Sequence, residues 1–204
     1  YEAKFQQDGF AWQTFRPDQF EPYEVQLAIA LSGGPLNGAG KETWIWIIDS
    51  GIDLDHPDLN VVTDEPYAVS FTSDTPEDDY GHGTIVAGMA AAINNNFGTC
   101  GVSSGAWVVP VKVGQPGFIS GYGAQLSSIL SALNHIAQYD IPGDVVNISI
   151  ASYEGDDCNT SAGDLAETLR DAVELLGWSG VWVCSGAGNN NDCTQADKNL
   201  TSCI

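Results

Sequence analysis

The segment TWIWIIDSG (residues 43–51) is a continuous apolar run that ends in an aspartate, a serine and a glycine. A short apolar run bounded by turn-forming residues is typical of a parallel strand that is buried on both faces. In open parallel sheets, ligands bind beyond the carboxyl ends of the strands. The segment therefore predicts a buried strand that carries the carboxyl group of Asp49 to the functional edge of a sheet.

The sequence after this segment alternates between strand-like and helix-like patterns. Further apolar runs predict strands at AWVVPVKV (106–113), DVVNISI (144–150) and VWVCSGAG (181–188). Helices are predicted at 83–93 from its alanines, and at 124–139 and 162–177 from apolar residues on one helical face: Leu126, Ile129, Leu130, Leu133 and Ile136, then Leu165, Leu169, Ala172, Val173 and Leu176. Strands that alternate with helices indicate an α/β fold with a parallel sheet and right-handed crossovers.

The composition restricts the partners of the chain. It has 204 residues, 43% of them hydrophobic, which suits one compact domain or most of one. Acidic residues outnumber basic ones by 27 to 6, and the formal net charge of -21 disfavours nucleic acid and anionic membranes. No apolar run approaches the roughly 18 residues that span a bilayer. The charge favours cations, either calcium or basic substrates; alternatively, it is a solvated acidic coat. We expect neither nucleic acid nor a membrane as a partner.

The cysteines are expected to fall into two groups. Cys100 and Cys184 stand among apolar or small residues and are predicted to be buried. Cys158, Cys193 and Cys203 lie in polar loops, where a secreted protein would form disulfides. Three cysteines cannot all pair with one another, so one of them is expected to bond to a polypeptide outside this chain. We therefore expect a secreted, extracellular protein.

The segment YGHGTIVAG (80–88) places His82 between two glycines at the start of a predicted helix. The backbone can approach the ring from both sides there, which suits a catalytic histidine better than a structural one. The last predicted strand runs into Asn189. A carboxylate fixes the tautomer of an imidazole, the imidazole moves a proton, and an amide stabilises an oxyanion. Asp49, His82 and Asn189 are therefore the parts of an acyl-transfer site.

Three motifs, in this order along the chain, resemble the subtilisin-like serine proteases: WIWIIDSGIDLDHPDL (44–59), GHGTIVAG (81–88) and the Gly-Asn-Asn that ends a strand (188–190). The resemblance implies a subtilisin-like, three-layer αβα fold with a mostly parallel sheet, incomplete in this chain. Residues 41–204 would be the Asp- and His-bearing part of the catalytic domain. Residues 1–40 would be an N-terminal arm, or a remnant of a prosegment, and a loop that leads into the domain. The start at Tyr1, with Met89 as the only methionine, favours a trimmed or cut N-terminus.

The resemblance also implies the catalytic roles. Asp49 would orient the imidazole, His82 would be the general base, and Asn189 would donate to the developing oxyanion. Gly83 and Gly88 would permit close helix packing behind the histidine.

The same resemblance implies where a peptide substrate would bind. Its backbone would pair with a strand at Ser149, Ile150 and Ala151, although family members usually have glycine at the last position. Gly186, Ala187 and Gly188 would form the wall of the pocket for the residue before the cleaved bond. The segment from Gly121 to Gly123 would form the opposite edge of the substrate channel.

The nucleophile of the family is a serine in a Gly-Thr-Ser-Met-Ala segment, which these 204 residues lack. Without a nucleophile the reaction cannot begin, so this chain alone is expected to be inactive. The serine is expected on a separate C-terminal chain of a cleaved protease, or on a segment that was truncated. Other expected partners are a peptide or protein substrate and a prosegment or inhibitor, as in a zymogen. The alternative function is a non-catalytic pseudo-protease module that binds extended peptides.

The segment INNNFGT (93–99) stands where the family has a calcium-binding loop. Calcium prefers carboxylate, amide and carbonyl oxygens. The resemblance implies a structural Ca²⁺ held by the side chains of Asp58 and Asn95 and the carbonyl groups of Ile93, Phe97 and Thr99. An asparagine-rich turn without a metal is the alternative.

Two acidic residues stand where the kexin- and furin-like branch of the family carries acids that receive basic substrate side chains. Asp79 precedes His82 by three residues and Glu154 follows Ser149 by five. They predict a preference for Arg or Lys around the cleaved bond. Solvated surface charge is the alternative.

Overall fold

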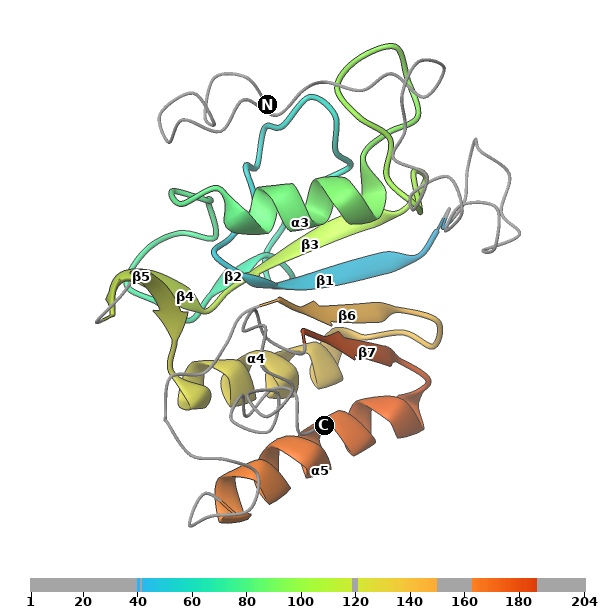
Figure 1. The fold of residues 1–204 in the computed structure, drawn as a ribbon. Coiled ribbons are helices and arrows are strands. Elements are labelled where there is room, and N and C mark those ends of the chain that lie inside the picture. The colour runs from blue at the N-terminus through green and yellow to red at the C-terminus, as the bar shows by residue number, and fades with distance from the viewer. Residues whose placement is uncertain (1–39, 41, 119–120, 150–162, 187–204) are drawn as a thin grey trace, which may run out of the picture.

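The computed structural model describes residues 40, 42–118, 121–149 and 163–186. The main sheet consists of β1 (Trp44–Asp49), β2 (Val69–Ser70), β3 (Trp107–Lys112), β6 (Val145–Ile148) and β7 (Trp182–Ser185). Its strand order is β2-β3-β1-β6-β7, and every neighbouring pair is parallel. The described helices are α3 (His82–Ala91), α4 (Leu126–Tyr139) and α5 (Gly163–Ser179). Helix α3 covers one face of the sheet, and α4 and α5 cover the other (Figure 1). The predicted three-layer α/β fold with a parallel sheet is confirmed.

Strand β1 lies at the centre of the sheet, between β3 and β6. Successive side chains of a strand point to opposite faces. Trp46 and Ile48 accordingly lie in the core that includes α4, whereas Ile45 and Ile47 lie in the core that includes α3. Because helices cover both faces, each of these positions must be apolar, which explains the unbroken apolar run in the sequence.

The helical faces predicted from the sequence are the buried ones. In α4 the buried side chains are Leu126, Ile129, Ala132, Leu133 and Ile136, while Leu130 is partly buried; in α5 they include Leu169 and Leu176. Helix α3 instead packs through small residues such as Ala87 and Ala91, both without exposed surface. Small side chains let this helix lie close to β1 and β3.

Two features at the rim of the sheet were not predicted. Strands β4 (Gly114–Phe118) and β5 (Gly121–Ala124) form an antiparallel pair with an irregular register, and β2 has two residues. The strands β4 and β5 are short and glycine-rich, and β2 has only two residues, so none of them shows the alternating pattern that predicts strands. Strand β4 follows β3 directly, and Val113 N donates to Asp49 O at 3.0 Å. The β4–β5 pair therefore starts at the same rim as Asp49.

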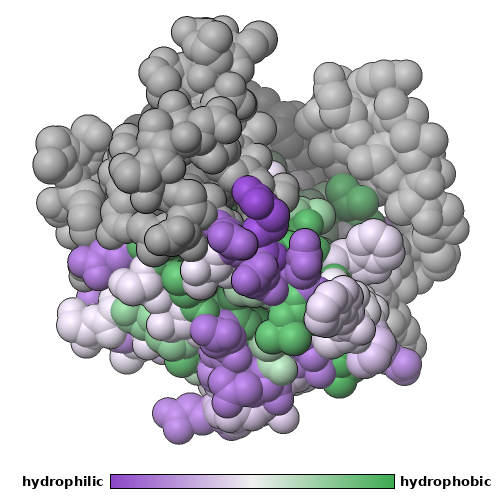
Figure 2. All heavy atoms as spheres, turned by 90° about the horizontal axis from the view of Figure 1, so that it is seen from below, coloured by the Kyte–Doolittle hydropathy of each residue, from purple (hydrophilic) through white to green (hydrophobic). Residues whose placement is uncertain are grey.

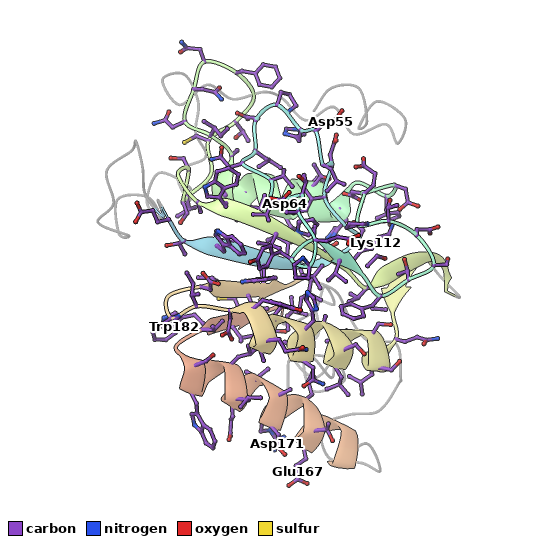
Figure 3. The ribbon with its side chains drawn as sticks, turned by 180° about the vertical axis from the view of Figure 1, so that it is seen from behind. Asp55, Asp64, Lys112, Glu167, Asp171 and Trp182 are labelled. Atoms are coloured by element: carbon purple, nitrogen blue, oxygen red, sulfur yellow. The ribbon has the colours of Figure 1, made fainter. Side chains whose placement is uncertain are left out.

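The α3 side of β7 is open to solvent within the described part of the chain. Trp182 and Cys184 are in register with Val145 and Asn147 of β6, and Val145 packs on the α3-side core. Trp182 is nevertheless 73% exposed and Cys184 is exposed too. Figure 3 shows Trp182 on the outer strand, far along the sheet from Lys112. The prediction that Cys184 is buried was wrong, because no described element covers this face of β7.

Of the two cysteines within the described residues, only Cys100 is buried as predicted, and no disulfide joins it to Cys184. The cysteines Cys158, Cys193 and Cys203 lie outside the described residues.

The outer surface of α5 mixes apolar and polar side chains, as Figure 2 shows from the side on which α5 lies. Leu175 and Trp178 are exposed, and Glu167 and Asp171 lie on the outer side of the same helix (Figure 3). Among the described helices, none combines the length and the apolar character that crossing a membrane requires.

Candidate active site

Asp49 and His82 form the centre of the site. The Nδ1 atom of His82 lies 2.7 Å from Oδ1 of Asp49, although the residues are 33 positions apart. Asp49 is the last residue of β1 and its side chain has no exposed surface, whereas His82 is the first residue of α3 and its side chain is 45% exposed. An ionised carboxylate only accepts hydrogen bonds, so Nδ1 donates and Nε2 is the nitrogen that can accept a proton.

The environment raises the pKa of both groups. Burial raises the pKa of Asp49, against the hydrogen bond and charge of His82, and among the described residues Oδ2 of Asp49 has no hydrogen-bond donor. The hydrogen bond that His82 donates to Asp49 raises the pKa of His82. Burial opposes this effect, and the charges of Asp49 and Asp78 add to it. A histidine must be neutral to accept a proton, so a base with this raised pKa would act only at a pH above the ordinary histidine pKa of about 6.5.

Gly83 brings the start of α3 against the end of β1. A Cβ at this position would lie 3.1 Å from Cβ of Asp49 and 3.2 Å from Oγ of Ser50, and would collide with the carbonyl oxygen of Gly51. Gly83 N also donates to Oγ of Ser50 at 2.8 Å. Only glycine permits this approach, and the approach places the imidazole of His82 beside the carboxyl group of Asp49.

The segment before His82 is held by a buried acid. Asp78 is 1% exposed, and its carboxylate accepts hydrogen bonds from the backbone around the start of α3 and from the hydroxyl groups of Ser50 and Thr84. The hydroxyl of Ser50 thus contacts both Asp78 and the backbone of Gly83. These groups fix the loop from which His82 starts.

A buried lysine holds the same loop from the other side. Lys112 ends β3 in register with Asp49, and its Nζ donates to the carbonyl oxygen of Glu77 and to Oδ1 of Asp79, both at 2.9 Å. The side chain of Lys112 is 2% exposed and that of Asp79 is 52% exposed. The carboxylate of Asp79 therefore has a cation beside it within the chain, while half of its surface faces solvent.

Sequence reasoning missed Ser50, Asp78 and Lys112. Lys112 interrupts the apolar run VVPVKV, and a lysine inside a buried strand requires an acidic partner; this was the available signal. Nothing local in the sequence distinguished Asp78, which is buried, from Asp79, which is exposed.

The residues predicted to bind substrate are partly described. Ser149 follows β6, and its Oγ accepts a hydrogen bond from Nδ2 of Asn147 at 2.8 Å. Gly186 follows β7 and donates to the carbonyl oxygen of Ile148 at 3.0 Å. Gly121 and Gly123 lie in β5. Because parallel strands end at one edge, Ser149 and Gly186 share the rim with Asp49. The other predicted site residues lie outside the described part of the chain: Asn189, Ile150, Ala151, Ala187, Gly188 and Glu154.

The predicted calcium ligands surround Asp58. Its buried carboxylate accepts from Nδ2 of Asn95 at 2.8 Å and from Thr99 N at 3.0 Å, while its carbonyl oxygen accepts from Ile93 N at 3.0 Å. Asn95 Oδ1 accepts from Phe97 N at 2.6 Å.

Burial raises the pKa of Asp58, against the hydrogen bonds from Thr99 and Asn95. Ca²⁺ prefers oxygen ligands, but the groups that face the Asp58 carboxylate here are N–H donors, Nδ2 of Asn95 and the backbone N of Thr99. Only one of the predicted ligands is an acid, and no described group of three or more His, Cys, Asp or Glu side chains could hold a metal.

Comparison with known proteins identifies the family of the chain. The profile of the Subtilase family matches residues 40–202. Subtilisin amylosacchariticus from Bacillus subtilis subsp. amylosacchariticus is 34% identical over 171 residues, which are 84% of this chain and 40% of that relative. The solved S41 psychrophilic protease superposes with a TM-score of 0.59 at 25% identity, covering 84% of this chain and 54% of that one. MycP1 from Mycobacterium smegmatis shares the fold, with a TM-score of 0.65 at 15% identity over 88% of this chain and 49% of that one.

The parallel α/β sheet with an acid–base pair at its carboxyl edge thus has the architecture of a subtilisin-like hydrolase. The chain belongs to the subtilase family, the subtilisin-like serine proteases, as its motifs predicted. It spans less than half of the length of the subtilisin that it matches.

Replacing Gly83 tests the close contact behind the histidine. Gly83→Ala is expected to cost about 1–3 kcal/mol of unfolding free energy, because the new methyl group has no space. It should also move His82 away from Asp49 and lower the pKa of the imidazole towards its ordinary value, as measured by NMR titration.

The matched control is Gly177→Ala in α5, where a Cβ meets no atom within 4 Å. It should leave stability unchanged or raise it by up to about 1 kcal/mol. Equal behaviour of the two variants would contradict the assignment of Gly83 as the point of closest approach.

Proposed function

We propose that the protein containing this chain is a serine endopeptidase that hydrolyses peptide bonds with an Asp-His-Ser triad. The contact of 2.7 Å between His82 Nδ1 and Asp49 Oδ1 is the observation that carries this proposal. It pairs a buried acid with a half-exposed imidazole at the rim where an α/β sheet binds its ligands.

Each of the three residues would have a separate role in the reaction. Nε2 of His82 would take the proton of a serine hydroxyl as its oxygen attacks the carbonyl carbon, and would then give the proton to the leaving amine. Asp49 would hold the ring and stabilise the imidazolium. The side-chain amide of Asn189 would donate to the oxyanion. Water, activated by the same histidine, would then hydrolyse the acyl-enzyme.

The nucleophilic serine, in this proposal, lies on a separate C-terminal chain or segment, and residues 1–204 alone are inactive. These residues contain no Gly-Thr-Ser sequence. The hydroxyl groups of Ser50 and Ser149, both at the rim, are engaged with neighbours inside the chain. The subtilisin relative has more than twice the matched length, since the match covers 40% of it.

The solvent-exposed face of β7 is the proposed packing site of that C-terminal segment. Trp182 lies on the α3 side of the sheet and is 73% exposed. A helix packed there would bury the indole and complete the layer that α3 begins. The strand that leads to Ser149 would bind the extended substrate, and also a prosegment or inhibitor. We propose that the protein acts outside the cell, as the cysteines in polar stretches of its sequence suggest.

A fluorescent serine-directed phosphonate tests this function on the full-length protein. We expect labelling of a serine outside residues 1–204, identified by peptide mass. His82→Ala should abolish labelling because the hydroxyl loses its base, whereas His135→Ala should not affect it. Residues 1–204 alone should remain unlabelled.

Labelling that survives in His82→Ala would contradict the proposed triad. Binding of extended peptides without any labelling would favour the pseudo-protease module instead.

The proposed substrate preference is for Arg or Lys around the cleaved bond, with Asp79 and Glu154 as partners. The exposed half of the Asp79 carboxylate supports this role. Because Lys112 already neutralises part of that charge, Glu154 would contribute most of the preference.

A peptide-library profile of the full-length protein checks this preference. Glu154→Gln should reduce the ratio of Arg/Lys to neutral cleavage about three- to fivefold, the effect of one partly exposed ion pair. Asp74→Asn, which removes an exposed acid, is the control and should not change the profile. A wild-type library profile indifferent to Arg and Lys would end the proposal.

The proposed structural calcium ion would be held by the side chains of Asp58 and Asn95 and the carbonyl oxygens of Ile93, Phe97 and Thr99. The ion would supply charge that neutralises the buried acid and would hold the loop against proteolysis. The proximity of Asn95 and Thr99 to the buried carboxylate of Asp58 supports this role. To bind the ion, the amide of Asn95 would turn its oxygen, which accepts from Phe97 N, towards it.

Calcium should raise the melting temperature of the protein, by an amount equivalent to about 2.7 kcal/mol at a hundredfold excess over Kd. Asp58→Asn should abolish the calcium-dependent increment, and Asp64→Asn should preserve it. Calorimetric titration provides the binding signal. No heat and no shift with the wild-type protein would show that hydrogen bonds alone close the loop.

A further inference from the structure

We propose that Asp78 is a positioning residue for the Asp49–His82 pair: its buried carboxylate holds the first turn of α3 and, through Ser50, the end of β1. The inference rests on the proposed peptidase function and adds a residue that touches neither substrate nor the transferred proton.

Asp78 acts as the cap of the helix that begins with His82. The residue before the helix, Gly81, has a left-handed backbone (φ 99°) and no side chain that could cap it. The first N–H groups of a helix need acceptors from outside it. Asp78 Oδ1 accepts from Gly81 N at 2.7 Å and from Tyr80 N at 3.1 Å, and Oδ2 accepts from Thr84 N at 2.9 Å and Thr84 Oγ1 at 2.6 Å. A negative charge also interacts favourably with this end of a helix.

Ser50 connects this cap to the strand that carries the catalytic acid. Its Oγ donates to Asp78 Oδ1 at 2.8 Å and accepts from Gly83 N at 2.8 Å. A hydroxyl has one hydrogen, so donating it to Asp78 leaves the lone pairs of oxygen directed to Gly83. Ser50 is adjacent to Asp49, and Gly83 is adjacent to His82. The neighbours of acid and base are thus joined by one hydroxyl whose orientation Asp78 determines.

The charge of Asp78 separates its role from that of Ser50. Together with Asp49, it raises the pKa of His82. The other charged groups around the site have contacts of their own. Lys112 donates to Asp79, and Glu77 accepts from the backbone N of Leu54. The backbone N of Asp53 donates to Oγ1 of Thr84. Removing the charge of Asp78 should lower the pKa of His82, whereas removing the hydroxyl of Ser50 changes no charge.

The test compares Asp78→Asn and Ser50→Ala in the full-length protein, with kcat and KM measured against pH. Asp78→Asn should lower kcat about ten- to hundredfold through misplacement of the base, with little change in KM. The acidic limb of the kcat–pH profile of this variant should shift to lower pH, because the lowered pKa of His82 keeps the imidazole neutral at lower pH. Ser50→Ala should lower kcat without moving that limb. Asp74→Asn, an exposed acid in the same loop, is the control and should match the wild type.

NMR titration of His82 provides a readout that does not require peptidase activity. A lower pKa of His82 in Asp78→Asn supports the proposal even if no substrate is cleaved. A failure of the positioning proposal can therefore be distinguished from a failure of the proposed peptidase function. Wild-type kcat with an unmoved limb in Asp78→Asn overturns it. If that variant does not fold, as judged by its melting curve, Ser50→Ala decides: wild-type kcat in this folded variant overturns the proposal.

Discussion

The structure depends on one backbone contact, between the end of β1 and the start of α3. At Gly83 no side chain separates the helix from the strand, and a methyl group there would meet Asp49, Ser50 and the backbone of Gly51. Two residues that follow the acid and the base, Ser50 and Gly83, are joined by a hydrogen bond of 2.8 Å. Because the backbones are held at this distance, Asp49 and His82 can make a short and direct contact.

Buried charge surrounds this contact, and its arrangement follows from the cost of burying ions. Asp49, Asp78 and Lys112 have almost no exposed surface. An unpaired buried charge is strongly destabilising, so each of them needs partners. Asp78 obtains N–H and hydroxyl donors from the helix start, and Lys112 obtains the carbonyl of Glu77 and the carboxylate of Asp79. The loop that precedes His82 is consequently held from both sides, and one of the groups that hold it, Asp78, also raises the pKa of His82.

In the described part of the chain, the helices cover one face of the sheet more completely than the other. Helices α4 and α5 cover the sheet on one side as far as β7, whereas on the other side α3 covers β1 and β3 only (Figure 1). Apolar surface on β7 therefore faces solvent, with Trp182 as its largest side chain. This agrees with a chain that spans less than half of the length of its subtilisin relative. The contact between Asp49 and His82 lies on the side of the sheet that α3 covers.

The sequence by itself determined the order of strands and helices, the buried faces of α4 and the pairing of Asp49 with His82, because these depend on local periodicity and on motifs of adjacent residues. It did not predict β2 or the β4–β5 pair, which are short and stabilised by their place at the rim. Asp78 and Asp79 are neighbouring carboxylates with the same local pattern, yet the tertiary structure buries one under the helix start and leaves the other beside Lys112 at the surface. Likewise Cys184 stands in an apolar run but is exposed. The partner of a buried charge and the element that covers a strand are residues far away in the sequence. Only the packed tertiary structure decides which residues make these contacts.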